Sequence, residues 1–284
     1  MSLKKMFKTA PLPFQGQKRR FAGSFVTALS ELSSKQEVKV IVDLFGGSGL
    51  LAHIAKNVVS EAKVIYNDYD NYSQRLRNID KTNQLLADIR SILANKPKDV
   101  KVDGIAKSKI LDRVRLEDKQ CYVDYITLSA SLLFSAKYAI DLNSFSNETF
   151  YNRIKASDYE FSPDEYLARL DVVCYDYQEL YNKYKDVPGV LFVVDPPYLS
   201  TDTSTYHSDK YWKLRDYLDV LNVLVDTNYI FFTSNKSSLV ELCEWLDDNK
   251  KFSNPFARSV LNTQNVTLNK DAKYTDMMLY KFVK

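Results

Sequence analysis

The pattern of apolar and polar residues alternates between two periods along the chain. Short runs rich in β-branched and aromatic residues, separated by polar stretches, predict buried strands. These strands are predicted at 38–45, 63–67, 171–175, 190–194, 229–233 and 276–283. Apolar residues at helical spacing predict helices at 49–59, 177–185, 209–226 and 236–248. Such alternation is typical of a parallel sheet whose strands are joined by right-handed crossovers.

The middle of the chain departs from this alternation. Residues 71–96 and 121–137 have helical character, whereas 143–161 is rich in Asn, Ser, Phe and Tyr and shows no clear period. Further on, polar breaks around 262–269 indicate a hairpin within 254–274. We therefore expect an α/β fold, with a doubly wound, Rossmann-like sheet and a mostly helical inserted lobe. The predicted domains are 1–70 with 169–284, and the insertion at 71–168.

Composition adds one unusual feature to an ordinary globular chain of 284 residues. Apolar residues make up 45% and charged residues 26%, which argues against disorder, and no apolar run approaches the roughly 18 residues of a membrane span. Glycine, however, occurs 7 times, where average usage predicts about 20. Gly46, Gly47 and Gly49 lie within four residues, directly after the strand at 38–45. Backbone freedom is therefore needed at this turn.

The charge distribution and the cysteine and histidine content limit the kinds of partner, metal site and cellular location to expect. The net charge is only +3, but no acidic residue precedes Glu31, so Lys18, Arg19 and Arg20 lie in a basic segment that could follow phosphates. A solvated basic N-terminus explains the same pattern. The 3 widely spaced cysteines and 2 histidines favour reduced thiols and no metal site. No secretion signal follows the basic segment, so we expect a cytoplasmic protein.

The glycine turn predicts a cofactor site. Glycines after a first strand let a ligand approach the backbone, and Asp68, at the end of the next strand, can bind ribose hydroxyls. Gly47-x-Gly49-x-x-Ala52 matches the dinucleotide fingerprint, so NAD is one candidate. Asp43, just before the turn, would repel a pyrophosphate but suits the ammonium group of S-adenosylmethionine. A purely structural turn is the third interpretation.

The run Asp195-Pro196-Pro197-Tyr198, directly after the strand at 190–194, is the most specific motif. The adenine N6 amine is a poor nucleophile, and two acceptors that bind its hydrogens can pull the nitrogen towards tetrahedral geometry. The Asp195 side chain and the Pro196 carbonyl would be those acceptors, because proline offers no backbone donor. The Tyr198 ring could stack on a base rotated out of a duplex. A Pro-Pro turn capped by aspartate is the alternative.

These two motifs, in this order around an insertion, resemble the Dam-type DNA adenine-N6 methyltransferases in their alpha arrangement. The N-terminal Phe14-x-Gly16-x-Lys18 is similar to that family's entry segment, and Asn67-Asp68 to its ribose-binding pair. The resemblance implies a methyltransferase sheet, S-adenosyl-L-methionine as cofactor and double-stranded DNA as substrate. It implies that Asp195, Pro196, Pro197 and Tyr198 are catalytic. The implied cofactor residues are Phe14, Lys18, Asp43, Phe45, Gly46, Gly47, Gly49, Asp68, Asp176, Tyr177 and Asp195.

Recognition of DNA is less well defined by the sequence. The segment 137–161 shows no match to the family's recognition region, so the recognition sequence stays open. Trp212, with Tyr206 and Tyr211, is a candidate for lining a base pocket. We expect a monomer, and a cognate restriction endonuclease is a candidate partner. The DNA-contact candidates are Lys18, Arg19, Arg20, Lys137, Arg153 and His207.

Several functions are compatible with these motifs. The same chemistry could act on cytosine N4, RNA or a protein glutamine, although an initial Asp195 favours adenine. A catalytically inactive DNA-binding relative, or a partner subunit of a restriction system, belongs to a different class. An NAD-binding oxidoreductase is the third possibility. The prediction is a site-specific DNA adenine-N6 methyltransferase that flips its target base.

Overall fold

Two parallel strands, β1 (Val40–Asp43) and β4 (Val190–Val194), pair directly at the centre of a sheet although about 150 residues separate them. The computed structural model describes residues 6–120, 122–134, 137–160, 163–198, 212–251, 253–267 and 273–283. Both strands consist of buried residues throughout, as expected for strands that are covered on both faces.

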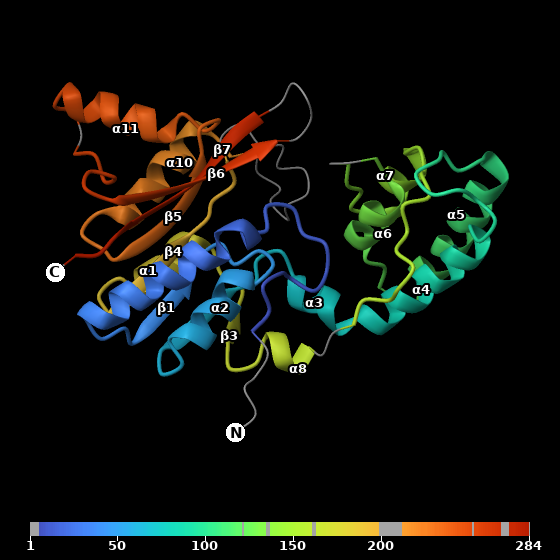
Figure 1. The fold of residues 1–284 in the computed structure, drawn as a ribbon, viewed down its shortest axis with the longest axis horizontal. Coiled ribbons are helices and arrows are strands. Elements are labelled where there is room, and N and C mark those ends of the chain that lie inside the picture. The colour runs from blue at the N-terminus through green and yellow to red at the C-terminus, as the bar shows by residue number, and fades with distance from the viewer. Residues whose placement is uncertain are drawn as a thin grey trace. The chain divides into compact units, whose positions relative to one another are not determined.

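Within the described residues the sheet has seven strands in the order β3-β2-β1-β4-β5-β7-β6. The first five are parallel, whereas β7 runs antiparallel to β5 and β6 antiparallel to β7. Strand order therefore reverses between β1 and β4, with β2 on one side and β5 on the other (Figure 1). The remaining strands are β2 (Lys63–Asn67), β3 (Asp171–Val173), β5 (Tyr229–Ser234), β6 (Val260–Thr267) and β7 (Lys273–Lys281).

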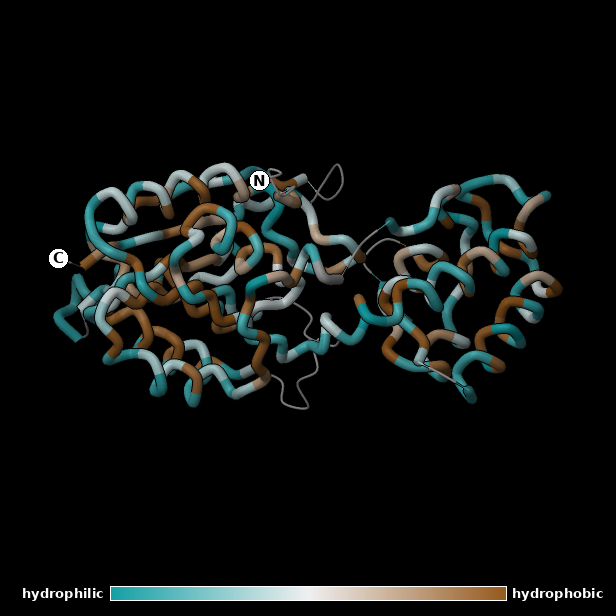
Figure 2. Tube along the Cα trace, turned by 90° about the horizontal axis from the view of Figure 1, so that it is seen from below, coloured by the Kyte–Doolittle hydropathy of each residue, from teal (hydrophilic) through white to brown (hydrophobic). Residues whose placement is uncertain are grey.

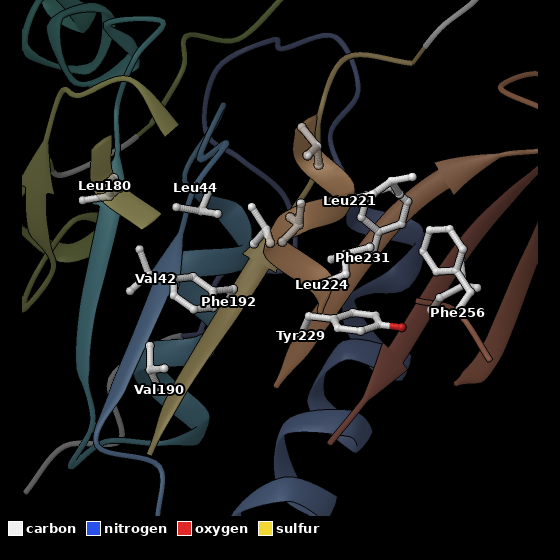
Figure 3. Close-up of a cluster of buried hydrophobic side chains, with 14 of the residues drawn as sticks. Val42, Leu44, Leu180, Val190, Phe192, Leu221, Leu224, Tyr229, Phe231 and Phe256 are labelled. Carbon is white, nitrogen blue, oxygen red and sulfur yellow. The ribbon is translucent and has the colours of Figure 1, made fainter. Parts of the chain in front are cut away.

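Helices cover both faces of the sheet. One face is covered by α9 (Tyr177–Tyr184), α10 (Leu214–Leu221), the short η2 (Asn222–Leu224) and α11 (Leu239–Asp248). Apolar residues of these elements form one buried cluster with Phe192 and Phe231 of the sheet (Figure 3). Phe232 points to the other face, where it meets Phe21 of η1 (Arg19–Phe21) and Phe25 of α1 (Ala22–Lys35). The helix α2 (Leu50–Val58) packs beside α1. The fold is thus a doubly wound α/β sheet, as predicted.

The chain divides into two compact units. The sheet unit contains Met1–Thr9, Gln17–Asp70 and Leu167–Lys284, and the helical unit contains Ala10–Gly16 and Asn71–Tyr166. Apolar and polar residues alternate along the helices of the helical unit, as in helices with one buried face (Figure 2). Its helices are α3 (Tyr72–Arg77), α4 (Ile79–Ile92), α5 (Gly104–Gln120), α6 (Tyr125–Leu132), α7 (Leu142–Asn147) and α8 (Pro163–Tyr166).

Some elements differ from the sequence prediction. The hairpin predicted within 254–274 agrees with the antiparallel pairing of the consecutive strands β6 and β7, but the predicted break at 262–269 is too early, because β6 continues through Val260–Thr267 as an edge strand. Most residues of β6 are partly or fully exposed, so the strand lacks a clear apolar alternation. The helix α5 was not predicted either, because it is rich in charged residues. In the described part of the chain no helix is long and apolar enough to cross a membrane.

The buried cluster on the sheet predicts a large effect of truncating its central ring. Phe192→Ala should lower the free energy of unfolding by about 3–5 kcal/mol, because a fully buried phenylalanine is replaced by a cavity. Leu261→Ala, on the exposed edge strand β6, is the control and should change it by no more than about 0.5 kcal/mol. Urea unfolding of both variants measures the difference. Equal losses would contradict this account of the core.

Candidate active site

The reversal of strand order places two carboxyl groups at one edge of the sheet. Asp43 is the last residue of β1, and Asp195 directly follows β4. Val193 pairs with Asp43 in the register of the two strands. Ligands of open α/β sheets bind in the crevice at the carboxyl ends of strands where the order reverses. This edge is therefore the candidate site.

The glycine turn after β1 is built against one aromatic ring. A Cβ atom on Gly46 would lie 2.3 Å from Cδ2 of Tyr66 and 2.8 Å from the carbonyl oxygen of Asn67. Gly47 and Gly49 have positive φ angles of 48° and 71°, and Gly49 is the N-cap residue of α2. The Tyr66 hydroxyl lies 2.8 Å from the Gly47 carbonyl oxygen and 2.9 Å from Asp68 Oδ1, and these two acceptors share its one proton. Tyr66, which sequence reasoning missed, thus shapes the turn and orients Asp68.

Asn67 joins the ends of three strands. Its Nδ2 donates to the carbonyl of Leu44 at 2.9 Å and to that of Tyr175 at 3.0 Å, and its Oδ1 accepts from the Tyr175 amide at 3.0 Å. Leu44 follows β1, and Tyr175 follows β3. The predicted pair Asn67-Asp68 therefore has two parts: a buried amide that holds the sheet edge together, and an acid beside the glycine turn.

A buried ion pair occupies the end of β4. Lys18 Nζ lies 2.6 Å from Asp195 Oδ2, and the two side chains are 9% and 16% exposed. The Lys18 ammonium also lies 5.2 Å from the centre of the Tyr198 ring and 5.9 Å from that of Phe232. Asp195 Oδ1 is buried and has no hydrogen-bond partner among the described residues. The pair therefore fixes one oxygen of Asp195 and leaves the other available to a ligand.

Three carboxyl groups surround this one ammonium. Burial raises the pKa of Asp195 to about 6, Lys18 opposes the rise, and Asp276 on β7 adds to it. Burial and the nearby Asp195 raise the pKa of Asp43 to about 8, although the amides of Phe45 and Ala52 and the charge of Lys18 lower it. Near neutral pH, Asp195 is therefore mostly ionised and Asp43 mostly protonated.

Asp276 on β7 influences this site, although the sequence predicts only a strand there. It pairs with Ser234 in the β5–β7 register, and Asn235 and Thr275 exchange two hydrogen bonds beside them. Asp276 Oδ1 and Ser234 Oγ are buried without hydrogen-bond partners among the described residues. Burial raises the pKa of Asp276, whereas Lys18, Arg20 and Lys236 lower it. The antiparallel pairing of distant strands, which no local pattern reveals, brings Asp276 here.

An aromatic cluster lies next to the glycine turn. The ring centres of Phe45 and Tyr177 are 5.0 Å apart, and Trp212 is 5.8 Å from each. Trp212, proposed from the sequence for a base pocket, thus packs with two predicted cofactor residues. Asp176 is exposed and caps α9 by accepting from the Gln178 amide at 2.8 Å.

The structure does not gather all the predicted site residues. Phe14 belongs to the helical unit, where its ring meets Tyr72 edge-on at 5.7 Å. Arg19 and Arg20 are exposed on the sheet unit. In the helical unit, Lys137 pairs with Glu148 at 2.8 Å and Arg153 with Asp99 at 3.5 Å. His207, Tyr206 and Tyr211 lie outside the described residues.

The described residues contain no group of three or more His, Cys, Asp or Glu side chains that could hold a metal ion. The polar groups at the site are carboxyls, a lysine, hydroxyls and backbone atoms. Such groups suit an organic ligand that carries ribose hydroxyls, a positive charge or an amine.

Comparison with known proteins defines the class. The family described as D12 class N6 adenine-specific DNA methyltransferase matches residues 14–275, which is most of the chain. The chain belongs to this family, and its substrate is DNA. A protein of Haemophilus influenzae (strain ATCC 51907 / DSM 11121 / KW20 / Rd) named "Putative methyltransferase" is 36% identical over 289 residues. The match covers 99% of this chain and 95% of that protein. The oxidoreductase interpretation of the glycine turn is therefore wrong.

The contact between Gly46 and Tyr66 predicts that even one methyl group distorts the turn. Gly46→Ala should lower the free energy of unfolding by about 1–3 kcal/mol, because neither the buried ring nor the Asn67 carbonyl can move freely. In Gly23→Ala, the matched control in α1, the new Cβ meets no atom within 4 Å. That variant should be unchanged or stabilised by up to about 1 kcal/mol. Urea unfolding that gives both variants the same stability would contradict the packing described.

Proposed function

We propose that this DNA adenine methyltransferase transfers a methyl group from S-adenosylmethionine to the N6 atom of an adenine rotated out of double-stranded DNA. The observation that supports this proposal is the difference between the two carboxylate oxygens of Asp195. Lys18 binds Oδ2 at 2.6 Å, while the buried Oδ1 has no partner among the described residues. A buried acceptor of this kind suits a donor that arrives with the substrate.

The residues of the glycine turn fit S-adenosylmethionine. Asp43 is 1% exposed, and the amides of Phe45 and Ala52 approach its carboxyl group, but no side chain among the described residues donates a hydrogen bond to it. An ammonium group would supply the missing partner and favour the ionised carboxyl. The absence of a side chain at Gly46 lets a ligand approach the backbone. When bound, this cofactor supplies the methyl group as an electrophilic sulfonium.

Two further groups are proposed to hold the nucleoside part of the cofactor. Asp68, oriented by the Tyr66 hydroxyl, would accept hydrogen bonds from the ribose. Phe45 and Tyr177 offer aromatic surface for the adenine ring, with Trp212 packed against both. Asp176 already caps α9, so we assign it to fixing the start of that helix, where Tyr177 is the first residue.

The target adenine is proposed to bind between Asp195 and Tyr198. Asp195 Oδ1 and the Pro196 carbonyl would accept the two N6 hydrogens and pull the nitrogen lone pair out of conjugation with the ring. The Tyr198 ring would stack on the base. As the nitrogen lone pair forms its bond to the methyl carbon, the sulfur–carbon bond breaks and one N6 proton leaves. Asp195 Oδ1 is the base placed to receive that proton, and the pKa of Asp195, raised to about 6 by burial, favours this role.

DNA binding is proposed to involve both units. Arg19 and Arg20 are exposed directly after Lys18 and can follow phosphates. The helical unit is inserted between β2 and β3 and is our candidate for base recognition. On that unit Lys137 and Arg153 could bind phosphates only by exchanging their acidic partners.

Asp195→Asn should abolish the charge that binds the target amine. We expect kcat to fall by about 100-fold or more, with unchanged circular dichroism. The assay incubates duplex DNA with S-adenosylmethionine and measures N6-methyladenine by mass spectrometry of the digested DNA. Asp248→Asn, an exposed carboxyl at the end of α11, is the matched control and should keep full activity. Undiminished methylation by Asp195→Asn would refute the mechanism, and DNA binding without methylation by the parent protein would identify an inactive relative.

Asp43→Asn should affect stability and cofactor binding in opposite directions. The pKa of Asp43, raised to about 8 by burial, exceeds that of an exposed aspartate at about 3.9. Between these values unfolding releases a proton, so the stability of the free protein falls as the pH rises. Asparagine does not titrate, so this variant should be the more stable protein near pH 8, and the gain should vanish below about pH 4.

Binding of S-adenosylmethionine to Asp43→Asn should weaken by roughly 10–100-fold, because its ammonium group loses a charged acceptor. Urea unfolding across the pH range and isothermal titration calorimetry measure the two effects. A variant that binds the cofactor as tightly as the parent protein would remove Asp43 from the cofactor site. A variant that is less stable near pH 8 would contradict the proposed protonation of Asp43.

A further inference from the structure

The N-terminal segment belongs to two units in succession. Ala10–Gly16 packs with the helical unit, and the sheet unit resumes at Gln17. Lys18, whose ammonium binds Asp195, is the next residue. Gly16 has a φ of 81°, a left-handed conformation that glycine adopts easily. One residue therefore separates a segment held by the helical unit from the partner of the catalytic carboxylate.

Tyr72 on α3 holds this segment by its backbone. The Tyr72 hydroxyl accepts from the Leu12 amide at 2.9 Å and donates to the Leu12 carbonyl at 3.0 Å. Both residues are almost fully buried, and the ring of Phe14 packs edge-on against Tyr72. Two hydrogen bonds to one backbone unit, made in a dry environment, fix both the position and the direction of the segment.

Arg75 makes a second attachment one turn further along α3. One of its guanidinium nitrogens donates to the Pro13 carbonyl at 2.7 Å, while Nε donates to both oxygens of Asp124 at 3.0 and 3.1 Å. Thr127 donates its amide and hydroxyl to the same carboxylate at 3.0 and 2.6 Å. Asp124, which caps α6, is 1% exposed. The segment is thus attached to a network that includes two helices of the helical unit.

We infer that Tyr72 and Arg75 are positioning residues for the reaction: by holding residues 10–16 on the helical unit, they keep Lys18 on Asp195. Neither touches the reacting atoms. Their effect passes through the backbone from Leu12 and Pro13 to Lys18. If the helical unit binds DNA, it can therefore act on the charge and orientation of Asp195. This last consequence rests on the proposed function.

The test is the titration of the Asp195 carboxyl itself. The protein is labelled with aspartate carrying ¹³C at the carboxyl carbon, and the Asp195 signal is assigned by its loss in Asp195→Asn. The charged groups that influence this carboxyl are Lys18, Asp43 and Asp276, and Arg20 and Lys236 act on Asp276. The titration needs neither DNA nor activity, so its outcome is independent of whether the proposed reaction occurs.

Tyr72→Phe removes the hydroxyl that binds Leu12 and keeps the buried ring. We expect it to raise the Asp195 pKa by about half a unit, since Lys18 then spends less time beside the carboxyl. Lys18→Met, which removes the ammonium, should raise that pKa by about 1–3 units. Tyr125→Phe is the matched control: it also removes a tyrosine hydroxyl in the helical unit, but that hydroxyl binds Asp118. It should leave the Asp195 titration unchanged.

The double variant Lys18→Met with Tyr72→Phe decides whether the effect passes through Lys18. Its Asp195 pKa should equal that of Lys18→Met alone. The inference is overturned if Tyr72→Phe titrates like the parent protein and Tyr125→Phe, or if its shift persists without Lys18. A parent protein that shows the predicted shifts but methylates no DNA would refute the proposed function and leave the coupling intact.

Discussion

The buried contact between Lys18 and Asp195 is the interaction on which the site depends. An aspartate at the end of a buried strand would lose its charge to burial, and the ammonium at 2.6 Å opposes that loss. The same contact orients the carboxylate, because Oδ2 is engaged and Oδ1 is not. A poor nucleophile such as an aromatic amine needs an oriented, charged acceptor more than it needs a strong base. The ion pair supplies both the charge and the orientation.

The fold brings further carboxyl groups to this ion pair by placing β1 and β4 side by side. Their carboxyl ends deliver Asp43 and Asp195 to one edge, and β7, running antiparallel beside β5, adds Asp276. Burial and the negative charge of Asp195 both raise the pKa of Asp43. Asp43 is therefore largely protonated near neutral pH. A positively charged group beside Asp43 would favour its ionised form.

The sequence predicted the fold class and the family because both depend on local patterns. Strand-like runs, the glycines after β1 and the run Asp195-Pro196-Pro197-Tyr198 are contiguous in the chain. What the sequence could not predict arises from contacts between distant positions. Tyr66 supports the turn from β2, and Asp276 reaches the site through antiparallel pairing with Ser234. The edge strand β6 and the charged helix α5 lack the amphipathic pattern that reveals such elements.

In the proposed reaction, Asp195 receives the amine of an adenine taken out of the duplex. A crystal structure of the protein with duplex DNA and a non-reactive analogue of S-adenosylmethionine tests it most directly. We predict an adenine outside the base stack, with its N6 atom about 3 Å from Asp195 Oδ1 and its ring against Tyr198, while Lys18 stays on Oδ2. An adenine that remains stacked in the duplex, or an N6 atom bound elsewhere while Asp195 contacts no base, would contradict the account.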